Sequence, residues 1–334
     1  MSRLAVLGGK PECRITWPTW PVFDKSEERG LLRVLRSGKW WKGANVAEFE
    51  RRFAAFQGAR YAVTTNSGTT ALEAAVSAAG IGPGDEVIVP AYTFIATASP
   101  VVRAGAVPVF GDIEPTSMCL DPRDVKRKLS RRTKAIIPVH FAGHVADMDG
   151  LRALARPRGI ALIEDACHAW GSRWRGKGAG TLGACGAFSF QISKNITAGE
   201  GGMLVTDHAD VAARAVAFTH AGRRAGRIWY EHFTPATNAR MTEFSAAVLL
   251  AQLARLPRQT ARRQANARIL DRGLASIPGL QPQGTDRRHG RRSFHFYAFR
   301  IDQEKLDITR EAFLRALSAE GVPGMGGWQS LDRN

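Results

Sequence analysis

The stretch Phe188–Gly202 reads FSFQISKNITAGEGG and places a single lysine between an apolar run and a cluster of glycines. Phe188 and Phe190 are typical of a buried strand, and Lys194 follows with small polar neighbours and no carboxylate before Glu200. A lysine that only has to meet solvent does not need this setting. The stretch therefore predicts a turn, between a strand and a glycine-rich loop, that presents one amine for a chemical purpose.

Predicted strands and helices alternate along most of the chain around this stretch. Apolar runs predict strands over 61–65, 86–89, 107–110, 134–139, 160–164 and 202–206, and helical spacing predicts helices over 24–36, 46–56, 69–79, 93–104 and 147–155. Alternation at this pitch predicts an α/β fold with a mostly parallel central sheet and helices on both of its faces.

The C-terminal part follows another pattern, which predicts a smaller α+β domain. Residues 241–256 are typical of a long amphipathic helix, 256–292 of a helix followed by a loop, 293–301 of a strand and 309–320 of a helix. We therefore divide the chain into an N-terminal arm (1–24), a large α/β domain (25–255) and a small C-terminal domain (256–334).

The composition indicates a chain that can bury a large core. It has 334 residues, 44% of them hydrophobic, which suggests about two domains. Its four cysteines show no CxxC pairing, so we expect neither a disulfide framework nor a zinc knuckle. The N-terminal MSRLAVLGGKPECR lacks the apolar core of a signal peptide, and charges or glycines interrupt every long apolar run. We therefore expect a cytoplasmic protein without a membrane span.

The formal net charge of +17 raises the question of a nucleic-acid partner. The arginines are scattered, however, and the densest basic run, DRRHGRR (Asp286–Arg292), has no interleaved aromatic residues for base stacking. We therefore expect most of this charge to be solvated surface, with a part of it available to attract an anionic cofactor or substrate, and we expect no nucleic-acid partner.

Reactive groups follow three of the predicted strands, at the strand ends where ligands bind in sheets of this kind. NSGTT (66–70) opens a helix with small residues whose free backbone N–H groups suit a phosphate, although an ordinary N-cap by Ser67 or Thr69 is an alternative. Asp165 ends a second strand and, taken alone, could be a salt-bridged structural acid. Lys194 follows the third. The conjunction of the three is far less expected by chance than any one of them.

Pyridoxal 5'-phosphate is a cofactor that uses all three groups. Its aldehyde forms a Schiff base with a lysine, a carboxylate keeps its ring nitrogen protonated, and its phosphate binds backbone amides. An aromatic ring stacked on the pyridine would hold it further. Phe94, after the strand EVIVP, is suitably placed for this, with core packing as the alternative.

Longer motifs run through the chain in the order of a known family. They are WPTWPVFD (17–24), SGKWWKG (37–43), NSGTTALEAA (66–75), VPAYTFIATA (89–98), DMDG (147–150), IEDACHAWGS (163–172), FSFQISKNITAGEGG (188–202) and NARMTEFSAAVLLAQL (238–253). With these motifs the chain resembles the sugar and aminocyclitol aminotransferases of the DegT/StrS type, which are fold-type I pyridoxal phosphate enzymes. The resemblance covers essentially the whole chain, and the lysine motif with its GEGG tail is highly specific.

The resemblance implies roles for individual residues. Lys194 would be the Schiff-base lysine and proton shuttle, and Asp165 would pair with the pyridinium nitrogen. Thr69, the backbone around Gly68, and Ser189 would hold the phosphate. Both catalytic groups and the phosphate site would thus lie at strand ends.

Further residues complete the site that the resemblance implies. His168 would lie near the ring hydroxyl of the cofactor, and Phe94 would stack on its ring. The family forms homodimers with shared active sites, so the segment around Asn238 and Arg240 would reach the phosphate bound by the neighbouring subunit. An internal salt bridge of Arg240 is the alternative.

Three features depart from the family pattern. Ala239 stands where an aromatic residue is common, and His144 stands where the motif PVHFAGH more usually ends in glutamine. The chain stops at GVPGMGGWQSLDRN, where related enzymes continue with elements that complete the small domain and supply substrate contacts. We therefore expect an incomplete small domain, and the sequence supports cofactor binding more strongly than turnover.

A metal site was weighed at His140, His144 and Asp147, whose spacing could ligate a metal ion. Pro138 and Gly143 indicate a loop here rather than one face of a helix. We therefore expect no metal site.

The sequence thus predicts an enzyme that moves an amino group from an amino acid, glutamine or glutamate, to a keto-sugar or keto-cyclitol in amino-sugar or aminocyclitol biosynthesis. The paired tryptophans and SFQ (Ser189–Gln191) most resemble the glutamine-dependent cyclitol and aminohydroxybenzoate-type members. The alternatives are a nucleotide-sugar aminotransferase and a non-catalytic or regulatory protein that keeps the fold.

Overall fold

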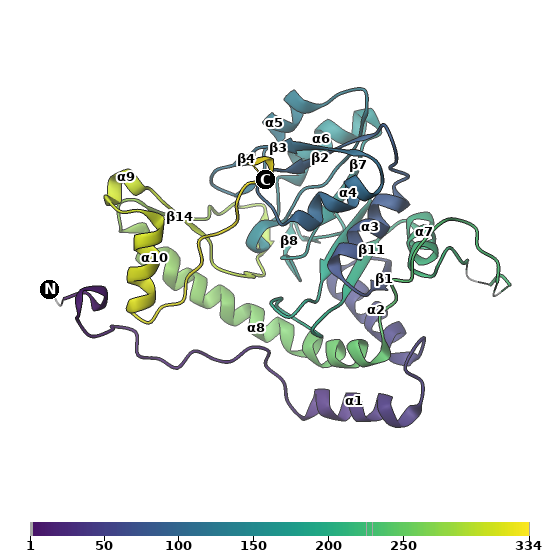
Figure 1. Ribbon diagram of the computed structural model, residues 1–334, viewed down its shortest axis with the longest axis horizontal. Helices are drawn as coiled ribbons and strands as arrows, with labels where there is room; N and C mark the ends of the chain where they lie inside the picture. Colours follow the sequence, from purple (N-terminus) through teal and green to yellow (C-terminus); the bar gives the residue numbers. More distant parts are fainter. Residues whose placement is uncertain (1–2, 225, 229, 334) are drawn as a thin grey trace.

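A computed structural model of the chain describes residues 3–224, 226–228 and 230–333 (Figure 1). Its centre is a seven-stranded sheet, in the order β1-β11-β10-β7-β6-β2-β3 within the described residues. These strands are β1 (Tyr61–Thr65), β11 (Gly202–Thr206), β10 (Cys185–Ser189), β7 (Ala161–Asp165), β6 (Thr133–Ile136), β2 (Glu86–Pro90) and β3 (Val107–Gly111). Only β11 runs antiparallel to its neighbours, so the predicted mostly parallel sheet is confirmed.

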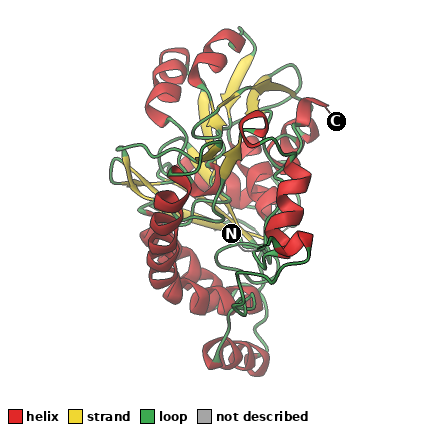
Figure 2. Cartoon of the chain, turned by 90° about the vertical axis from the view of Figure 1, so that its left-hand side faces the viewer, coloured by secondary structure: helices red, strands yellow, loops and turns green. Residues whose placement is uncertain are grey.

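Helices cover both faces of the sheet, as predicted (Figure 1, Figure 2). The α-helices are α1 (Lys25–Ser37), α2 (Ala44–Gln57), α3 (Gly68–Ala78), α4 (Ser99–Arg103), α5 (Pro122–Lys128), α6 (Met148–Ala155), α7 (Ala209–Thr219), α8 (Glu243–Ala275), α9 (Gln303–Leu306) and α10 (Arg310–Ala319). Short 3-10 helices are η1 (Ala5–Leu7), η2 (Ile95–Thr97), η3 (Phe141–Gly143), η4 (Arg156–Arg158) and η5 (Leu331–Arg333). Minor strands are β4 (Ile113–Glu114), β5 (Cys119–Leu120), β8 (Arg173–Trp174), β9 (Lys177–Gly178), β12 (Leu280–Pro282), β13 (His289–Arg291) and β14 (Phe299–Ile301).

Two apolar cores lie on the two faces of the sheet because successive strand side chains point to opposite sides. On one face Phe188 packs with Phe53 of α2 and with apolar residues of α6 and α8. On the other face Ala187 packs with Leu72 of α3 and with residues of α4 and α7. The strands are buried on both sides, which explains why their sequences read as continuous apolar runs.

The register of the sheet brings the predicted reactive groups to one edge. Strand β10 runs parallel to β7 with Ala187 opposite Asp165. The chain therefore leaves β7 at Asp165 and β10 at Ser189 on the same side. Helix α3 starts beside them, because Ser67 caps it by accepting from Thr70 N (3.1 Å) at the end of β1.

Helix α8 differs from its prediction, because it continues to Ala275 instead of ending near 256. It runs from below the central sheet toward the C-terminal elements in Figure 1, crossing the predicted boundary at 255/256. Pro257 lies inside the helix without ending it. The division into domains stays a prediction.

The predicted strand over 293–301 is wrong for most of its length, since only Phe299–Ile301 pairs as a strand. Phe294 has a positive φ of 48°, and His295 N donates to Ala142 O (3.2 Å) instead of joining a ladder. The predicted helix over 93–104 is also broken into η2 and the short α4. In both places contacts with distant segments override the local pattern.

The basic run Asp286–Arg292 also differs from the expectation of solvated charge. Arg288 Nη1 pairs with Asp147 Oδ1 (2.8 Å), and its guanidinium stacks on Trp174 with 4.3 Å to the ring centroid. Arg292 is buried and donates from Nη2 to Gln283 Oε1 (2.6 Å). Part of this run is therefore structural.

The N-terminal arm runs along the lower side of the molecule in Figure 1, beneath α8, and leads to α1, which protrudes from the body (Figure 1, Figure 2). Ala5 N donates to Glu320 Oε1 (2.8 Å), and Trp20 Nε1 donates to Ile192 O (2.6 Å) beside Lys194. Arg255 of α8 pairs with Asp24 at the start of α1 (3.0 Å). No helix among the described residues is long and apolar enough to cross a membrane.

Candidate active site

Lys194 lies on the turn after β10 with a half-buried side chain. Its backbone N–H donates to Gln191 O (2.9 Å), and Gln191 Oε1 accepts from Ser193 N and Oγ (2.8 Å each), so local hydrogen bonds shape this turn. Burial lowers the pKa of Lys194, while Cys167 and Asp165 nearby oppose the shift. A lowered pKa increases the share of free amine, the form that attacks a carbonyl.

Asp165 ends β7 and is only 6% exposed. Its Oδ2 accepts from Thr97 Oγ1 (2.8 Å), and its Oδ1 accepts from Cys167 N (3.2 Å). No ion pair reaches Asp165 from the described residues, so the salt-bridged structural acid is not what the structure shows. The hydroxyl and amide donors orient the carboxylate without supplying a counter-charge, which suits it to pair with a cationic ring nitrogen.

Gly68, Thr69 and Ser189 meet at the N-terminus of α3. Thr70 N donates to the Ser67 hydroxyl, and Ala71 N donates to Ser67 O to begin the backbone ladder of α3. The amides of Gly68 and Thr69 therefore lie at the open end of the helix, where an anion is favoured. A Cβ added to Gly68 would come within 2.6 Å of Ser189 Cβ, so only glycine allows this approach. The predicted phosphate cradle is thus brought together, and Ser67 rather than Thr69 is the N-cap.

His168 is buried next to the loop at Ala142, whose N–H points to His168 Nδ1 (3.4 Å). Burial, together with the positive charges of His295 and Lys194, holds the pKa of His168 well below its usual value. The ring is therefore neutral at physiological pH. With Nδ1 accepting, Nε2 carries the hydrogen and can donate to a ligand oxygen.

Phe94 is 58% exposed and caps η2 at the same edge of the sheet. Its ring centroid lies 6.3 Å from that of Trp328. Core packing, the alternative for this residue, does not describe so exposed a ring. Its open face is available to a flat ligand.

Asn238 and Arg240 stand apart from this group within the single chain. Arg240 Nε donates to Asn238 Oδ1 (2.8 Å), and its guanidinium stacks on Trp41 with 4.5 Å to the ring centroid. Between them, Ala239 O accepts from Asn66 N (2.8 Å), two residues before Gly68. No carboxylate among the described residues forms an ion pair with Arg240, so the alternative of an internal salt bridge is not observed.

The three residues weighed as metal ligands have separate partners. His140 Nε2 pairs with Glu164 Oε2 (2.7 Å), His144 Nδ1 contacts Val145 O (3.0 Å), and Asp147 caps α6. No group of three potential metal ligands occurs within the described parts of the chain. His144, which departs from the family pattern, therefore lies outside the Lys194 group. It lies in a packed seam, where its ring meets that of His289 edge to face with 4.0 Å between centroids.

Sequence reasoning missed the residues that reach the site from the C-terminal part. The His295 ring lies 4.5 Å from that of His168, and His295 Nδ1 approaches Asn195 Oδ1 (3.4 Å), directly after Lys194. Trp328 packs 5.5 Å from the ring of His168. The histidine in SFHFYAF was the available signal, but a strand prediction does not say which end of the molecule it reaches.

The geometry fits pyridoxal phosphate. A lysine with a lowered pKa, a carboxylate that no ion pair reaches from the described part of the chain and a helix terminus that only glycine allows occur at one sheet edge. The chain matches the DegT/DnrJ/EryC1/StrS aminotransferase family over residues 21–328.

The chain belongs to this family.

Relatives within the family agree in sequence and in structure. The chain is 42% identical to 3-amino-5-hydroxybenzoate synthase of Amycolatopsis mediterranei over 95% of its own length and 82% of that protein. It is 40% identical to L-glutamine:2-deoxy-scyllo-inosose aminotransferase of Micromonospora echinospora, over 96% and 80%. The crystal structure of a 3-amino-5-hydroxybenzoic acid synthase superposes with a TM-score of 0.90 at 41% identity, covering 96% of this chain and 84% of that one.

These findings confirm the predicted enzyme class, fold and cofactor. The chain is a fold-type I aminotransferase, and pyridoxal phosphate is the cofactor of its family.

Proposed function

We propose that this aminotransferase transfers the amino group of L-glutamine to a keto-cyclitol or a related carbocyclic ketone. The observation that carries the proposal is the meeting of Lys194, Asp165 and the Gly68–Ser189 contact at one sheet edge. The named activities of relatives about 40% identical support the donor and the acceptor class. A nucleotide-sugar acceptor is the alternative.

The cofactor, when bound, supplies an electron sink for the carbon that loses or gains the amino group. Asp165 would keep its ring nitrogen protonated, since Thr97 and Cys167 N orient the carboxylate without neutralising it. Thr69, the amide of Gly68 and Ser189 would hold the phosphate.

His168 and Lys194 would have different roles in the site: His168 would donate a hydrogen bond, and Lys194 would attach the cofactor and carry a proton. His168 would donate from Nε2 to the ring oxygen, because its Nδ1 is occupied by Ala142 N–H. Lys194 would attach the cofactor and then move a proton at the reacting carbon, for which its lowered pKa is suited. Phe94 would cover the ring face.

The test of this proposal is a pair of half-reactions followed by absorbance. L-glutamine added to the protein loaded with pyridoxal phosphate should convert the cofactor band, and 2-deoxy-scyllo-inosose should then restore it. A band that no amino acid changes would contradict the aminotransferase reaction in this chain. Restoration only by nucleotide-linked keto-sugars would favour the alternative acceptor.

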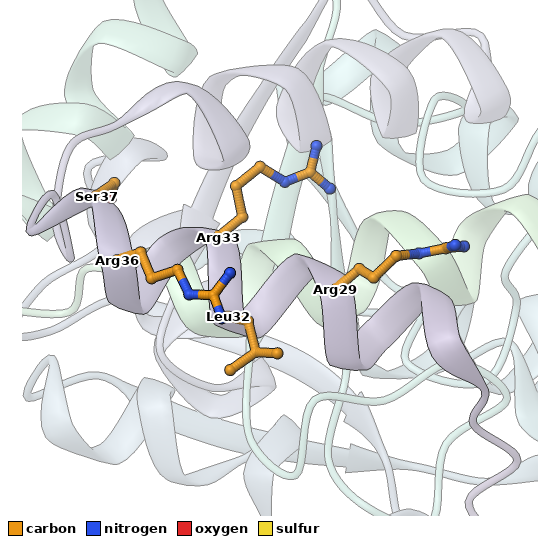
Figure 3. A pocket seen from close by; sticks show the side chains of 5 residues that line it. All are labelled: Arg29, Leu32, Arg33, Arg36 and Ser37. Carbon is orange, nitrogen blue, oxygen red and sulfur yellow. The ribbon is translucent and has the colours of Figure 1, made fainter.

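We further propose a homodimer in which Asn238 and Arg240 complete the neighbouring site. Leucines on the outer face of helix α1 are suited to contact a second copy of the chain. Leu31, Leu32 and Leu35 are 36%, 38% and 52% exposed, and exposed apolar side chains on one helix are typical of a protein interface. Three arginines lie on the same helix, and Arg29, Leu32, Arg33, Arg36 and Ser37 line a pocket there (Figure 3).

A mixing experiment tests the shared site. Lys194→Ala and the double variant Asn238→Ala/Arg240→Ala are each impaired and are refolded together. A shared site regenerates one intact site per heterodimer, so cofactor absorbance should partly recover. No recovery in demonstrated heterodimers would mean that each chain builds its site alone.

A further inference from the structure

Five aromatic side chains from distant parts of the sequence surround one face of the candidate site, next to His168. The Trp328 ring lies 5.5 Å from Phe141, 6.1 Å from Tyr92, 6.3 Å from Phe94 and 6.5 Å from Phe296 between centroids. We call these five residues the Trp328 cluster. They come from the loop after β2, from η3 and from the C-terminal part of the chain.

The segment that carries Trp328 is held on the large sheet by specific contacts. Trp328 N donates to Tyr92 Oη (3.3 Å), and Leu331 N donates to Ala91 O (2.8 Å). Gly327 has a φ of 77°, and a Cβ there would come within 2.5 Å of Tyr92 Oη. The position of the indole is therefore built into the fold and does not depend on a loose tail.

The cluster is open on one side. Phe94 is 58% exposed and Trp328 is half-buried, whereas Phe141 is buried beneath them. Trp328 and Phe141 pack against the ring of His168, with 5.5 Å and 6.1 Å between centroids, so the cluster forms an aromatic wall on the His168 side of the candidate site. A substrate that approaches the site beside His168 would meet these aromatic side chains.

The chemistry of the wall favours one acceptor class. Aromatic rings can pack against the C–H face of a six-membered ring, whether it is a carbocycle or the hexose of a nucleotide-sugar. A nucleoside diphosphate additionally requires guanidinium, ammonium or helix amide donors for its phosphates. The cation–π contacts observed in the described residues use other rings, such as Arg240 on Trp41 and Arg288 on Trp174, and none uses the Trp328 cluster.

We propose that Trp328 is a specificity-determining residue that forms a wall of the acceptor subsite and selects a six-membered carbocyclic ketone that carries no nucleotide. This inference rests on the proposed function, because only an aminotransferase has an acceptor. It goes beyond that function by naming the residue that separates the two acceptor classes.

The test measures equilibrium binding of a ligand by calorimetry. The protein is loaded with pyridoxal phosphate, a form that carries no amino group, so that the ketone binds without being converted. The probes are 2-deoxy-scyllo-inosose and thymidine diphosphate. The variants are Trp328→Ala, Trp328→Phe and, as a matched control on the same segment, Met325→Ala, whose side chain is 68% exposed. Circular dichroism and the cofactor band report whether each variant is folded.

We expect the carbocycle to bind and thymidine diphosphate not to bind at the same concentration. Trp328→Ala should weaken carbocycle binding about 3- to 10-fold, as expected for a lost aromatic contact, while Trp328→Phe and Met325→Ala should change it by less than about twofold. Equal affinity in Trp328→Ala, or tighter binding of thymidine diphosphate than of the carbocycle, would overturn the inference. If Trp328→Ala does not fold, Trp328→Leu replaces it in the same comparison.

The same preparations separate this inference from the proposed function. L-glutamine should convert the cofactor band in wild type and in Met325→Ala alike. If no variant responds, the proposed function fails. If L-glutamine converts the band and the affinity for the carbocycle is equal in wild type and Trp328→Ala, only the assignment of Trp328 fails.

Discussion

Two regions build the candidate site in different ways. Asp165 and Ser189 leave neighbouring parallel strands, and their positions follow from the register of the central sheet. His295 and Trp328 come from irregular segments of the C-terminal part, and long-range contacts with Ala142 and Tyr92 hold them. The comparison suggests that the sheet edge carries the invariant chemistry of the cofactor and that the C-terminal segments adapt the site to a substrate.

The division of roles between the two regions would be contradicted most strongly if the cofactor were not attached at the sheet edge. Lys194→Ala should lower transamination by on the order of 10⁴-fold or more, because the nucleophilic amine and the proton carrier are lost together. Borohydride reduction and peptide mapping of the wild type should place the pyridoxyl group on Lys194. Lys177→Ala, at an exposed lysine of β9, is the control and should retain activity. A label on another lysine would refute the assignment.

Removing the charge of Asp165 should have the next largest effect. Asp165→Asn should still bind pyridoxal phosphate but should lower the half-reaction rate by roughly 10²–10³-fold, because a neutral amide no longer favours the protonated ring nitrogen. Stopped-flow absorbance with L-glutamine measures this rate. Asp210→Asn, which weakens an exposed pair with Arg214 on α7, should behave as wild type. A near-normal rate in Asp165→Asn would remove this residue from the chemistry.

The seam between the two regions should make stability sensitive to acid. Burial is the first cause that lowers the pKa of His144 to about 2 and that of His289 to about 4. Both lie below the unfolded value of about 6.5, so the unfolded chain binds more protons as the pH falls through this window. The contribution of each neutral imidazole to stability is therefore complete above about pH 6.5 and is lost as the pH falls toward the folded pKa.

For His144 this loss should amount to about 2 kcal/mol between pH 7 and pH 5. Urea unfolding at the two pH values measures it. In His144→Phe the difference should shrink by about that amount, since no proton can bind there, whereas the exposed His208→Gln should leave it unchanged. An unchanged pH dependence in His144→Phe would show that this imidazole is not held neutral.

The smallest expected effect concerns the single hydrogen bond that orients Asp165. Thr97→Val removes the hydroxyl that donates to Asp165 Oδ2 and should slow the half-reaction by about 3- to 10-fold, as expected for one hydrogen bond to a charged group. Thr93→Val is the matched control, because Thr93 Oγ1 contacts Thr97 Oγ1 (2.8 Å) and makes no hydrogen bond to the carboxylate within the described chain. Equal half-reaction rates in the two variants would show that the Thr97 hydroxyl is not needed to orient the Asp165 carboxylate.

The sequence by itself predicted the parts of this protein whose pattern is local. The runs 61–65 and 202–206 are strands with the predicted bounds, because strands covered on both faces of a sheet read as continuous apolar runs. Asp165, Ser189 and Gly68 could be expected to meet, because strands of one parallel sheet end at one edge. The isolated lysine in the turn after the strand and the family motifs indicated the chemistry.

Only the tertiary structure decided which distant segments complete that edge. The alternation over 293–301 predicted a strand, yet Phe294 takes a left-handed conformation and places His295 beside Lys194, because contacts with Ala142 and Asn195 hold it there. Trp328 gave no local signal for the aromatic wall that it completes. Periodicity in the sequence indicates only the local secondary structure. Which side chain contacts which, when the two are more than a hundred residues apart, depends on how the whole chain packs.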